Sequence, residues 1–179
     1  MGGSAVPAGV IADAVAAAKA YLRLEGGTED AVLAPLARAA IGLGEQFCAQ
    51  ALVARGFDDA VAASADWQRL PACPAIAIDA VTGAGGGALP VGSYAIDIDA
   101  DGVGWVRVTA PAAGAVVRVA YRAGEAADWG GLPGPVAQGV TMLVGHLFAQ
   151  GADDRAPPAA VAALWRPFRR MRIGAEVRR

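Results

Sequence analysis

Residues 83–88 form the first of several stretches whose composition could support chemistry. They read GAGGGA, which fits the loose glycine pattern of a dinucleotide-binding turn, and a strand is expected before them. That pattern requires a helix next, so that backbone N–H groups converge on a pyrophosphate. The residues that follow are LPVGSYAI, with a proline and strand character. We therefore interpret 83–88 as a hairpin loop and expect no nucleotide cofactor.

An acidic turn offers a second possibility. Asp97, Asp99 and Asp101, followed by Gly102, match the opening of a calcium-binding loop, in which alternate carboxylates converge on one cation. The last ligand of such a loop is a bidentate Glu, and Val108 stands there instead. The flanking residues also predict strands and not helices. We interpret the stretch as a solvated Asp-Gly turn, with a cation-dependent enzyme or small hydrolase as the alternative.

The remaining reactive side chains occur singly. His146 is the only histidine and Lys19 the only lysine, and neither lies in a nucleophile motif. Cys48 and Cys73 lack the spacing of a zinc site and are interpreted as reduced, mostly buried thiols of a cytosolic chain. The sequence therefore predicts no catalytic, cofactor-binding or metal-ligating residue, and we expect a protein that is not an enzyme.

The composition of the chain excludes several other classes of protein. The chain has 179 residues, which suits one domain with an inserted subdomain. Its net charge of −2 argues against a general nucleic-acid binder. No signal peptide and no membrane span are expected, since no apolar run is long enough. Apolar residues make up 55% of the chain, but many are alanines that bury little area, which favours oligomerisation.

Two helices are expected at the start of the chain. Ile11, Val15, Ala18 and Leu22 form a helical stripe that the glycines at 26–27 should end. A second, longer helix over Thr28–Gln50 is expected to organise the core, with Thr28 as its N-cap. Its predicted core stripe consists of Leu33, Leu36, Ala40, Leu43 and Phe47.

The middle of the chain changes to strand-like runs separated by Gly, Pro and Asp. Short connections between these runs favour antiparallel pairing. Alternation of Val106 and Val108 with Arg107 and Thr109, and of Ile96 and Ile98 with Asp97 and Asp99, predicts a sheet with one wet face. The expected strands are Leu52–Ala62, Ala75–Val81, Ser93–Asp97, Gly104–Thr109 and Ala115–Tyr121.

Helical periodicity returns after residue 133, where Val136, Val140, Leu143 and Leu147 recur at helical steps. A proline-rich break and a short helix follow. The predicted fold class is therefore α+β: a small helical bundle of three main helices plus a short C-terminal helix, with an inserted antiparallel β subdomain. We expect residues 1–179 to form one domain, with helices at about 8–50 and 133–170, the β insertion at about 51–122 and a basic arm at 165–179.

Several phrases, in this order, resemble phage head–tail connector (adaptor) proteins. AAAKAYLRLEGGTEDAVLAPLARAAIGLGEQF resembles the opening helices of that family, and QRLPACPAIAIDAV its strand entry. YAIDIDADG and VVRVAYRAG are similar to its central β region. LPGPVAQGVTMLVGHLFAQ is similar to its third helix, and LWRPFRRMRI to its closing phrase. The resemblance covers about residues 16–173, although Phe148 and Ala149 depart from the family pattern.

The resemblance implies a structural adaptor that forms a ring, commonly of about twelve subunits. Such a ring lies between the portal of a tailed phage or gene transfer agent particle and a tail-side stopper or tail protein. It extends the channel for double-stranded DNA, without sequence-specific binding, and contacts no membrane. We expect the protein in the neck region of a virion or phage-like particle that assembles in the bacterial cytoplasm. A phage and a gene transfer agent origin both remain open.

The basic arm is the predicted portal-binding segment. Residues 165–179 contain six arginines against one acid, Glu176. Arginines can fork onto carboxylates of an acidic partner while apolar groups anchor the contact. Core packing is the alternative for the tryptophan of this segment, and a nucleic-acid-binding module is the alternative for the arm as a whole. The predicted portal contacts are Trp165, Arg166, Phe168, Arg169, Arg170, Met171 and Arg172.

Overall fold

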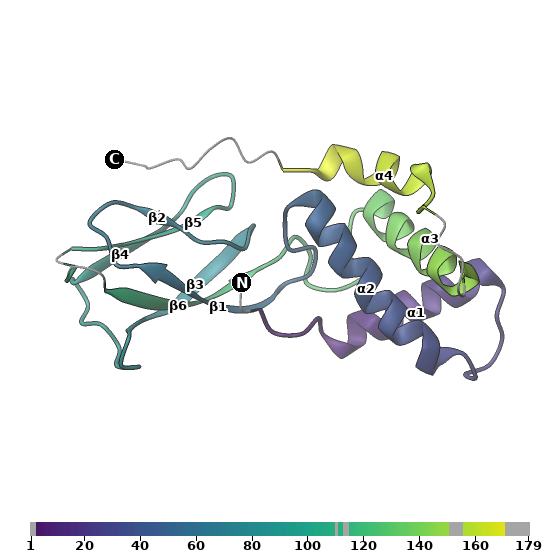
Figure 1. Ribbon diagram of the computed structural model, residues 1–179, viewed down its shortest axis with the longest axis horizontal. Helices are drawn as coiled ribbons and strands as arrows, with labels where there is room; N and C mark the ends of the chain where they lie inside the picture. The colour runs from purple at the N-terminus through teal and green to yellow at the C-terminus, as the bar shows by residue number, and fades with distance from the viewer. Residues whose placement is uncertain (1–2, 110, 113–114, 151–155, 171–179) are drawn as a thin grey trace. The chain divides into compact units, whose positions relative to one another are not determined.

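The computed structural model describes residues 3–109, 111–112, 115–150 and 156–170. The chain divides into two compact units. A helical unit contains Val6–Val53 and the described part of Ala126–Met171. A β unit contains Ala54–Glu125 together with residues 3–5. The β unit is thus an insertion between two helical segments, over nearly the stretch 51–122 expected from the sequence (Figure 1).

The helical unit consists of α1 (Ala8–Leu22), α2 (Asp30–Cys48), α3 (Gly134–Gln150), α4 (Ala159–Trp165) and a 3-10 turn, η1 (Arg166–Phe168). Helices α1, α2 and α3 pack against one another, and α4 packs on α3. α1 ends earlier than the predicted glycines. Arg23 takes a left-handed conformation (φ 58°) and its N–H bonds the carbonyls of the last turn.

Helix α2 differs from its prediction in two ways. It begins at Asp30 after Glu29 and has no side-chain cap, so Thr28 is not its N-cap. Its buried side is also rotated from the predicted stripe: Leu33 and Ala40 are buried as expected, but Leu43 is 44% exposed. The buried face is Leu33, Ala37, Ala40, Ile41, Gly44 and Cys48. Three of these six residues, Ala37, Ala40 and Gly44, are small and let neighbouring elements approach closely.

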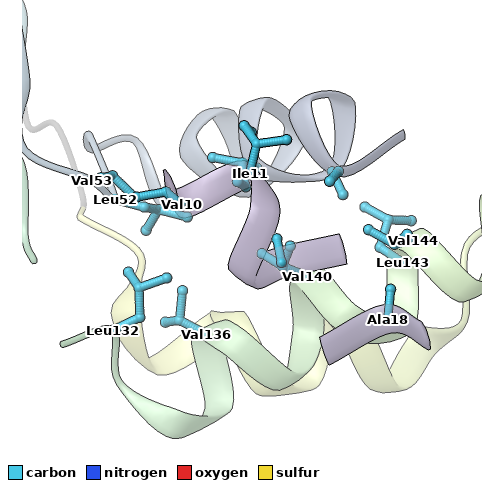
Figure 2. Close-up of a cluster of buried hydrophobic side chains, with 14 of the residues drawn as sticks. Val10, Ile11, Ala18, Leu52, Val53, Leu132, Val136, Val140, Leu143 and Val144 are labelled. Atoms are coloured by element: carbon cyan, nitrogen blue, oxygen red, sulfur yellow. The ribbon is translucent and has the colours of Figure 1, made fainter. Parts of the chain in front are cut away.

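One apolar cluster fills the helical unit, and Figure 2 shows part of it. Val136, Val140 and Leu143 of α3 lie in it as predicted, together with Val144. The predicted stripe of α1 is also largely buried, with Ile11, Val15 and Ala18 in the cluster and Leu22 packed at its border. The chain connecting α2 to the β unit adds two more buried residues, Leu52 and Val53.

The β unit contains two antiparallel sheets of three strands. One has the order β1-β6-β3 (Arg55–Ala62, Val116–Ala123, Ala75–Gly83), and the other the order β2-β5-β4 (Gln68–Arg69, Gly104–Val108, Tyr94–Ile98). The five expected strands are confirmed, with ends that differ by at most three residues. The two-residue strand β2 was not predicted, because so short a run has no periodicity. The α+β fold class is confirmed.

Strand alternation holds on one predicted pair and fails on the other. On β5, Val106 and Val108 are buried and Arg107 is exposed, as expected for one wet face. On β4, Ile96 is 44% exposed, so the predicted inward position of this isoleucine is wrong. β4 lies at the edge of its sheet and pairs only with β5, which leaves less of the strand covered.

Candidate functional site

The glycine-rich stretch closes a tight turn. The N–H of Gly83 donates to the Gly87 carbonyl (2.9 Å), and the N–H of Gly86 donates to the Gly83 carbonyl (2.9 Å). Gly86 has a φ of +80°, which favours glycine, and Thr82 pairs with Ala88 across the turn. The next regular element is strand β4 and not a helix. The turn thus has the hairpin geometry expected of it and lacks the helix that a pyrophosphate site requires.

The carboxylate of Asp99 accepts hydrogen bonds from nearby groups of the same turn and strand. Its Oδ1 accepts from the N–H groups of Asp101 (3.0 Å) and Val103 (2.8 Å), and its Oδ2 accepts from Trp105 Nε1 (2.9 Å). Gly102 completes the turn with a φ of +72°. These bonds make Asp99 the organiser of a turn, as the Asp-Gly interpretation predicts. Among the described residues, no cluster of three or more His, Cys, Asp or Glu side chains could hold a metal ion.

Both cysteines are buried. Cys48 is 0% exposed and Cys73 1% exposed. Burial raises the pKa of the Cys48 thiol to about 11, so it stays protonated at neutral pH, and the thiolate is the reactive form. His146 is half-buried on α3. The burial of both cysteines agrees with the expectation from the sequence.

A buried hydrogen-bonded pair in the β unit was not anticipated. The hydroxyl of Tyr121 on β6 donates to Asp59 Oδ2 (2.7 Å) on β1 and accepts from the N–H of Ala72 (2.9 Å). Burial, and then the bond to Asp59, raise the pKa of Tyr121. Asp59 is 4% exposed. The pair ties two strands to the chain before β3. A sequence signal did exist, because Asp59 falls on the same side of β1 as Phe57, which is buried.

Trp165, the first predicted portal contact, lies in the core of the helical unit and is 3% exposed. Its Nε1 donates to the Val136 carbonyl of α3 (3.2 Å), and its ring centroid lies 5.9 Å from that of Phe47. Gly44 and Gly139 line the slot that holds the indole: a Cβ on Gly44 would lie 3.3 Å from the ring, and one on Gly139 would overlap Nε1. Core packing, the alternative raised for this tryptophan, is therefore what the structure shows.

The residues after Trp165 lie at the surface of the helical unit. Arg166 and Arg169 are exposed and Phe168 is partly buried. Arg170 is fixed more firmly, because its N–H donates to the Cys48 carbonyl (2.9 Å) and its Nε to Gln50 Oε1 (2.7 Å). The structure thus brings two arginines and an aromatic ring together on one short turn and anchors both ends of that turn. Met171 and Arg172 lie outside the described residues.

None of the described helices combines the length and apolar character that crossing a bilayer requires.

Several solved particle structures contain chains similar to this protein. A chain from the neck of an empty gene transfer agent (GTA) particle, computed with C6 symmetry, is 29% identical; the match covers 99% of this chain and 100% of that chain, with a TM-score of 0.80. For the neck of a native GTA particle computed with C12 symmetry, the identity is 29%, the coverage 99% and 100%, and the TM-score 0.73. For the virion of a native GTA particle, the identity is 28%, the coverage 96% and 93%, and the TM-score 0.71. No protein-family model and no curated protein matches the sequence.

The similar structures support a structural neck or connector role, a ring oligomer and a place within a phage-like particle. They agree with the order of elements that the sequence phrases indicated. The resemblance to head–tail connector proteins is thereby confirmed: the chain is a connector-like protein, similar along almost its whole length to chains from the neck of GTA particles.

Proposed function

We propose that this protein is a non-enzymatic neck adaptor, which forms a ring of about twelve copies between a portal and the tail-side proteins and extends the DNA channel. The observation that carries the proposal is the match to a chain of a C12-symmetric GTA neck, over 99% of this chain and 100% of that one. Because the match spans both units, the whole chain fits one role. Double-stranded DNA passes the lumen without sequence-specific contacts.

The portal contact is proposed for the turn that follows Trp165. Arg166 and Arg169 are exposed, and Phe168 between them offers an apolar group. An arginine fork can bind a carboxylate with two parallel hydrogen bonds, while an aromatic ring fills a pocket. Met171 and Arg172 extend the same basic sequence. This arrangement suits an acidic groove on a protein partner.

Trp165 and Arg170 support the proposed portal contact indirectly, by holding the turn in position. Trp165 is buried between Gly44 and Gly139, so it holds the turn in place and does not itself reach a partner. Arg170 bonds Gln50 and the Cys48 carbonyl, which fixes the point where the chain leaves η1. A turn that is already ordered before binding loses less conformational entropy on binding than a flexible one.

The test is portal binding by a charge-reversed variant. Deleting residues 164–179 is expected to abolish binding, but it also removes Trp165 from the core and so confounds contact with folding. Arg166→Glu/Arg169→Glu leaves the core intact. Its affinity for an immobilised portal ring should fall about 100-fold, since each lost pair is worth at least about 1.4 kcal/mol. Arg38→Glu, an exposed arginine on α2, is the matched control and should bind as the unaltered protein does.

Equal affinity of the reversed variant and the unaltered protein for the portal would contradict the proposed contact. The same variants distinguish portal binding from nucleic-acid binding, which is the alternative function of the basic arm. If the arm binds nucleic acid, the unaltered protein will bind duplex DNA with an affinity that falls steeply with salt, and the reversed variant will lose that binding.

A further inference from the structure

Helix α2 carries a second apolar stripe, which its own unit covers only in part. The stripe, termed here the outer stripe, consists of Val32, Leu36, Ala39 and Leu43. Val32 is 49% exposed and Leu43 is 44% exposed, and Ala39 is exposed. Leu36, between them, is partly buried against the core cluster. Leu36 and Leu43 belong to the stripe that periodicity predicts as core. The predicted core stripe is right for Leu33 and Ala40, which are buried, and wrong for Leu43, which lies on the outer side of the helix.

The geometry of the helix makes these four residues one surface. At about 100° per residue, they fall within roughly 60° of one another around the α2 axis. The buried face of the helix is centred roughly 120° away. The charged residues of α2 lie elsewhere: Arg38 points away from the outer stripe, Asp30 bonds Lys19 (2.7 Å), and Glu45 accepts from the N–H of Leu52 (3.0 Å). The outer stripe is therefore a ridge of apolar groups without a charge.

We propose that the outer stripe packs against a neighbouring copy of this chain in the ring. The inference rests on the ring assembly proposed above and adds the surface through which one copy contacts the next. In a cyclic ring each copy uses two different patches, so an apolar ridge on one copy meets another surface on its neighbour. Exposed Val and Leu side chains at helical spacing are the groups whose burial would drive that contact.

The chemistry of the outer stripe favours contact with a second copy of this chain over contact with DNA or the portal. DNA contacts depend on cations, and the stripe has none. The proposed portal contact uses the arginines of η1, on a different element of the helical unit. The similar chains come from necks of C6 and C12 symmetry, in which copies surround one axis. A repeated apolar contact between copies fits that arrangement.

A site-specific cross-link tests the proposal. In Leu43→Cys, the new thiol is selectively labelled with a maleimide benzophenone, because both native cysteines are buried. The labelled protein is assembled with its portal, imaged and irradiated. The proposal predicts a ladder of cross-linked copies, with dimers first. Arg38→Cys, labelled in the same way on the opposite side of α2, should give at least tenfold less of the dimer.

Three outcomes would overturn the inference while the ring remains visible by imaging. These are cross-links from residue 43 to the portal, cross-links only within one chain, and a ladder equally strong from residue 38. Absence of rings from the unaltered protein with its portal would instead overturn the proposed function itself. The two failures are thus distinguishable.

The same Ala→Glu substitution at two exposed positions of α2 gives a second, matched test. Ala39 and Ala31 are both exposed on α2, but only Ala39 lies on the outer stripe. Ala39→Glu should raise the protein concentration needed for ring assembly on the portal at least tenfold, while Ala31→Glu leaves it unchanged. Both variants should give the helical circular dichroism of the unaltered protein. Equal assembly by the two variants would overturn the inference.

Discussion

The helical unit and the β unit differ in the contacts that stabilise each of them internally. The helical unit depends on small residues that leave room for one large side chain, since Gly44 and Gly139 form the slot that Trp165 fills. The β unit depends on side chains that bond the backbone across turns and strands, through Tyr121 and Asp99. In the helical unit, close packing around one indole brings distant segments together, and the indole also donates to the Val136 carbonyl. In the β unit, the buried Tyr121 hydroxyl bonds residues of two other segments. Both units also bury apolar side chains.

Both units leave large apolar side chains exposed, but those on α2 lie along one stripe of one helix. Alanines and glycines on the buried side of α2 fill the core without using the larger side chains of its other side. Val32 and Leu43 therefore remain outside, available to a neighbour. In the β1-β6-β3 sheet, the outward side chains include ion pairs between Arg118 and Asp58 and between Arg122 and Asp79. Val116, on the same side of β6 as these arginines, is 42% exposed, so that face carries both charged and apolar groups.

The largest expected effect comes from emptying the slot of the helical unit. Trp165→Ala should lower the free energy of unfolding by about 3–5 kcal/mol, because a buried indole is lost and a cavity remains. Gly139→Ala should cost about 1–3 kcal/mol by forcing its Cβ into the indole. Urea denaturation followed by helical circular dichroism measures both.

Two controls make this prediction specific. Gly42→Ala places the same methyl group where no neighbouring atom lies within 4 Å, and should stabilise α2 by about 0.5–1 kcal/mol. Gly139→Ala in the Trp165→Ala background should cost much less than it does alone, because the clash is gone. Additive costs in the double variant would show that the slot is not what holds the helices.

A smaller effect is expected in the β unit. Tyr121→Phe removes the hydroxyl that bridges Asp59 and the N–H of Ala72, and should lower the free energy of unfolding by about 1–3 kcal/mol. Thermal unfolding followed by tryptophan fluorescence reports it, since Trp105 lies in this unit. Tyr94→Phe is the control: the structure gives this hydroxyl no hydrogen bond to a described residue, so little change is expected. Equal melting temperatures for the two variants would contradict the role of the bridge.

The smallest effect is expected on the outer face of the β unit. Arg118 and Asp58 form an ion pair at 3.0 Å, but both side chains are about half exposed (53% and 52%), so water and salt screen the pair. Arg118→Ala should leave the melting temperature unchanged within experimental error. A loss as large as that of Tyr121→Phe would mean that the surface charges, and not the buried hydrogen bonds, hold the β unit together.

Local patterns predicted much of the fold. Helices α1 and α3 follow from periodicity, because each has one buried face and the side chains repeat with the helical period. The strands follow from short β-rich runs bounded by Gly, Pro and Asp, and β4 shows no buried face. Helix α2 is apolar on two faces, and periodicity alone cannot tell which face the chain buries by itself. Leu43 was placed on the core side for that reason. An N-cap at Thr28 was also expected, but the helix begins after Glu29 without a side-chain cap.

The candidate site was predicted in part. The basic turn with Arg166, Phe168 and Arg169 was identified from composition, and its role at the portal remains a prediction. The burial of Trp165 depends on Gly139 and Val136, which no local pattern connects to it. The partner of Asp59 likewise lies on a distant strand. Contacts of this kind follow from tertiary packing, which short-range spacing does not encode.

Imaging tests the central claim most directly. The purified protein, alone and mixed with its portal, is examined by negative-stain or cryo-electron microscopy. The account predicts closed rings of this chain stacked on one end of the portal, with an open channel along the axis. Single copies that leave the portal bare at saturating protein concentration would contradict it.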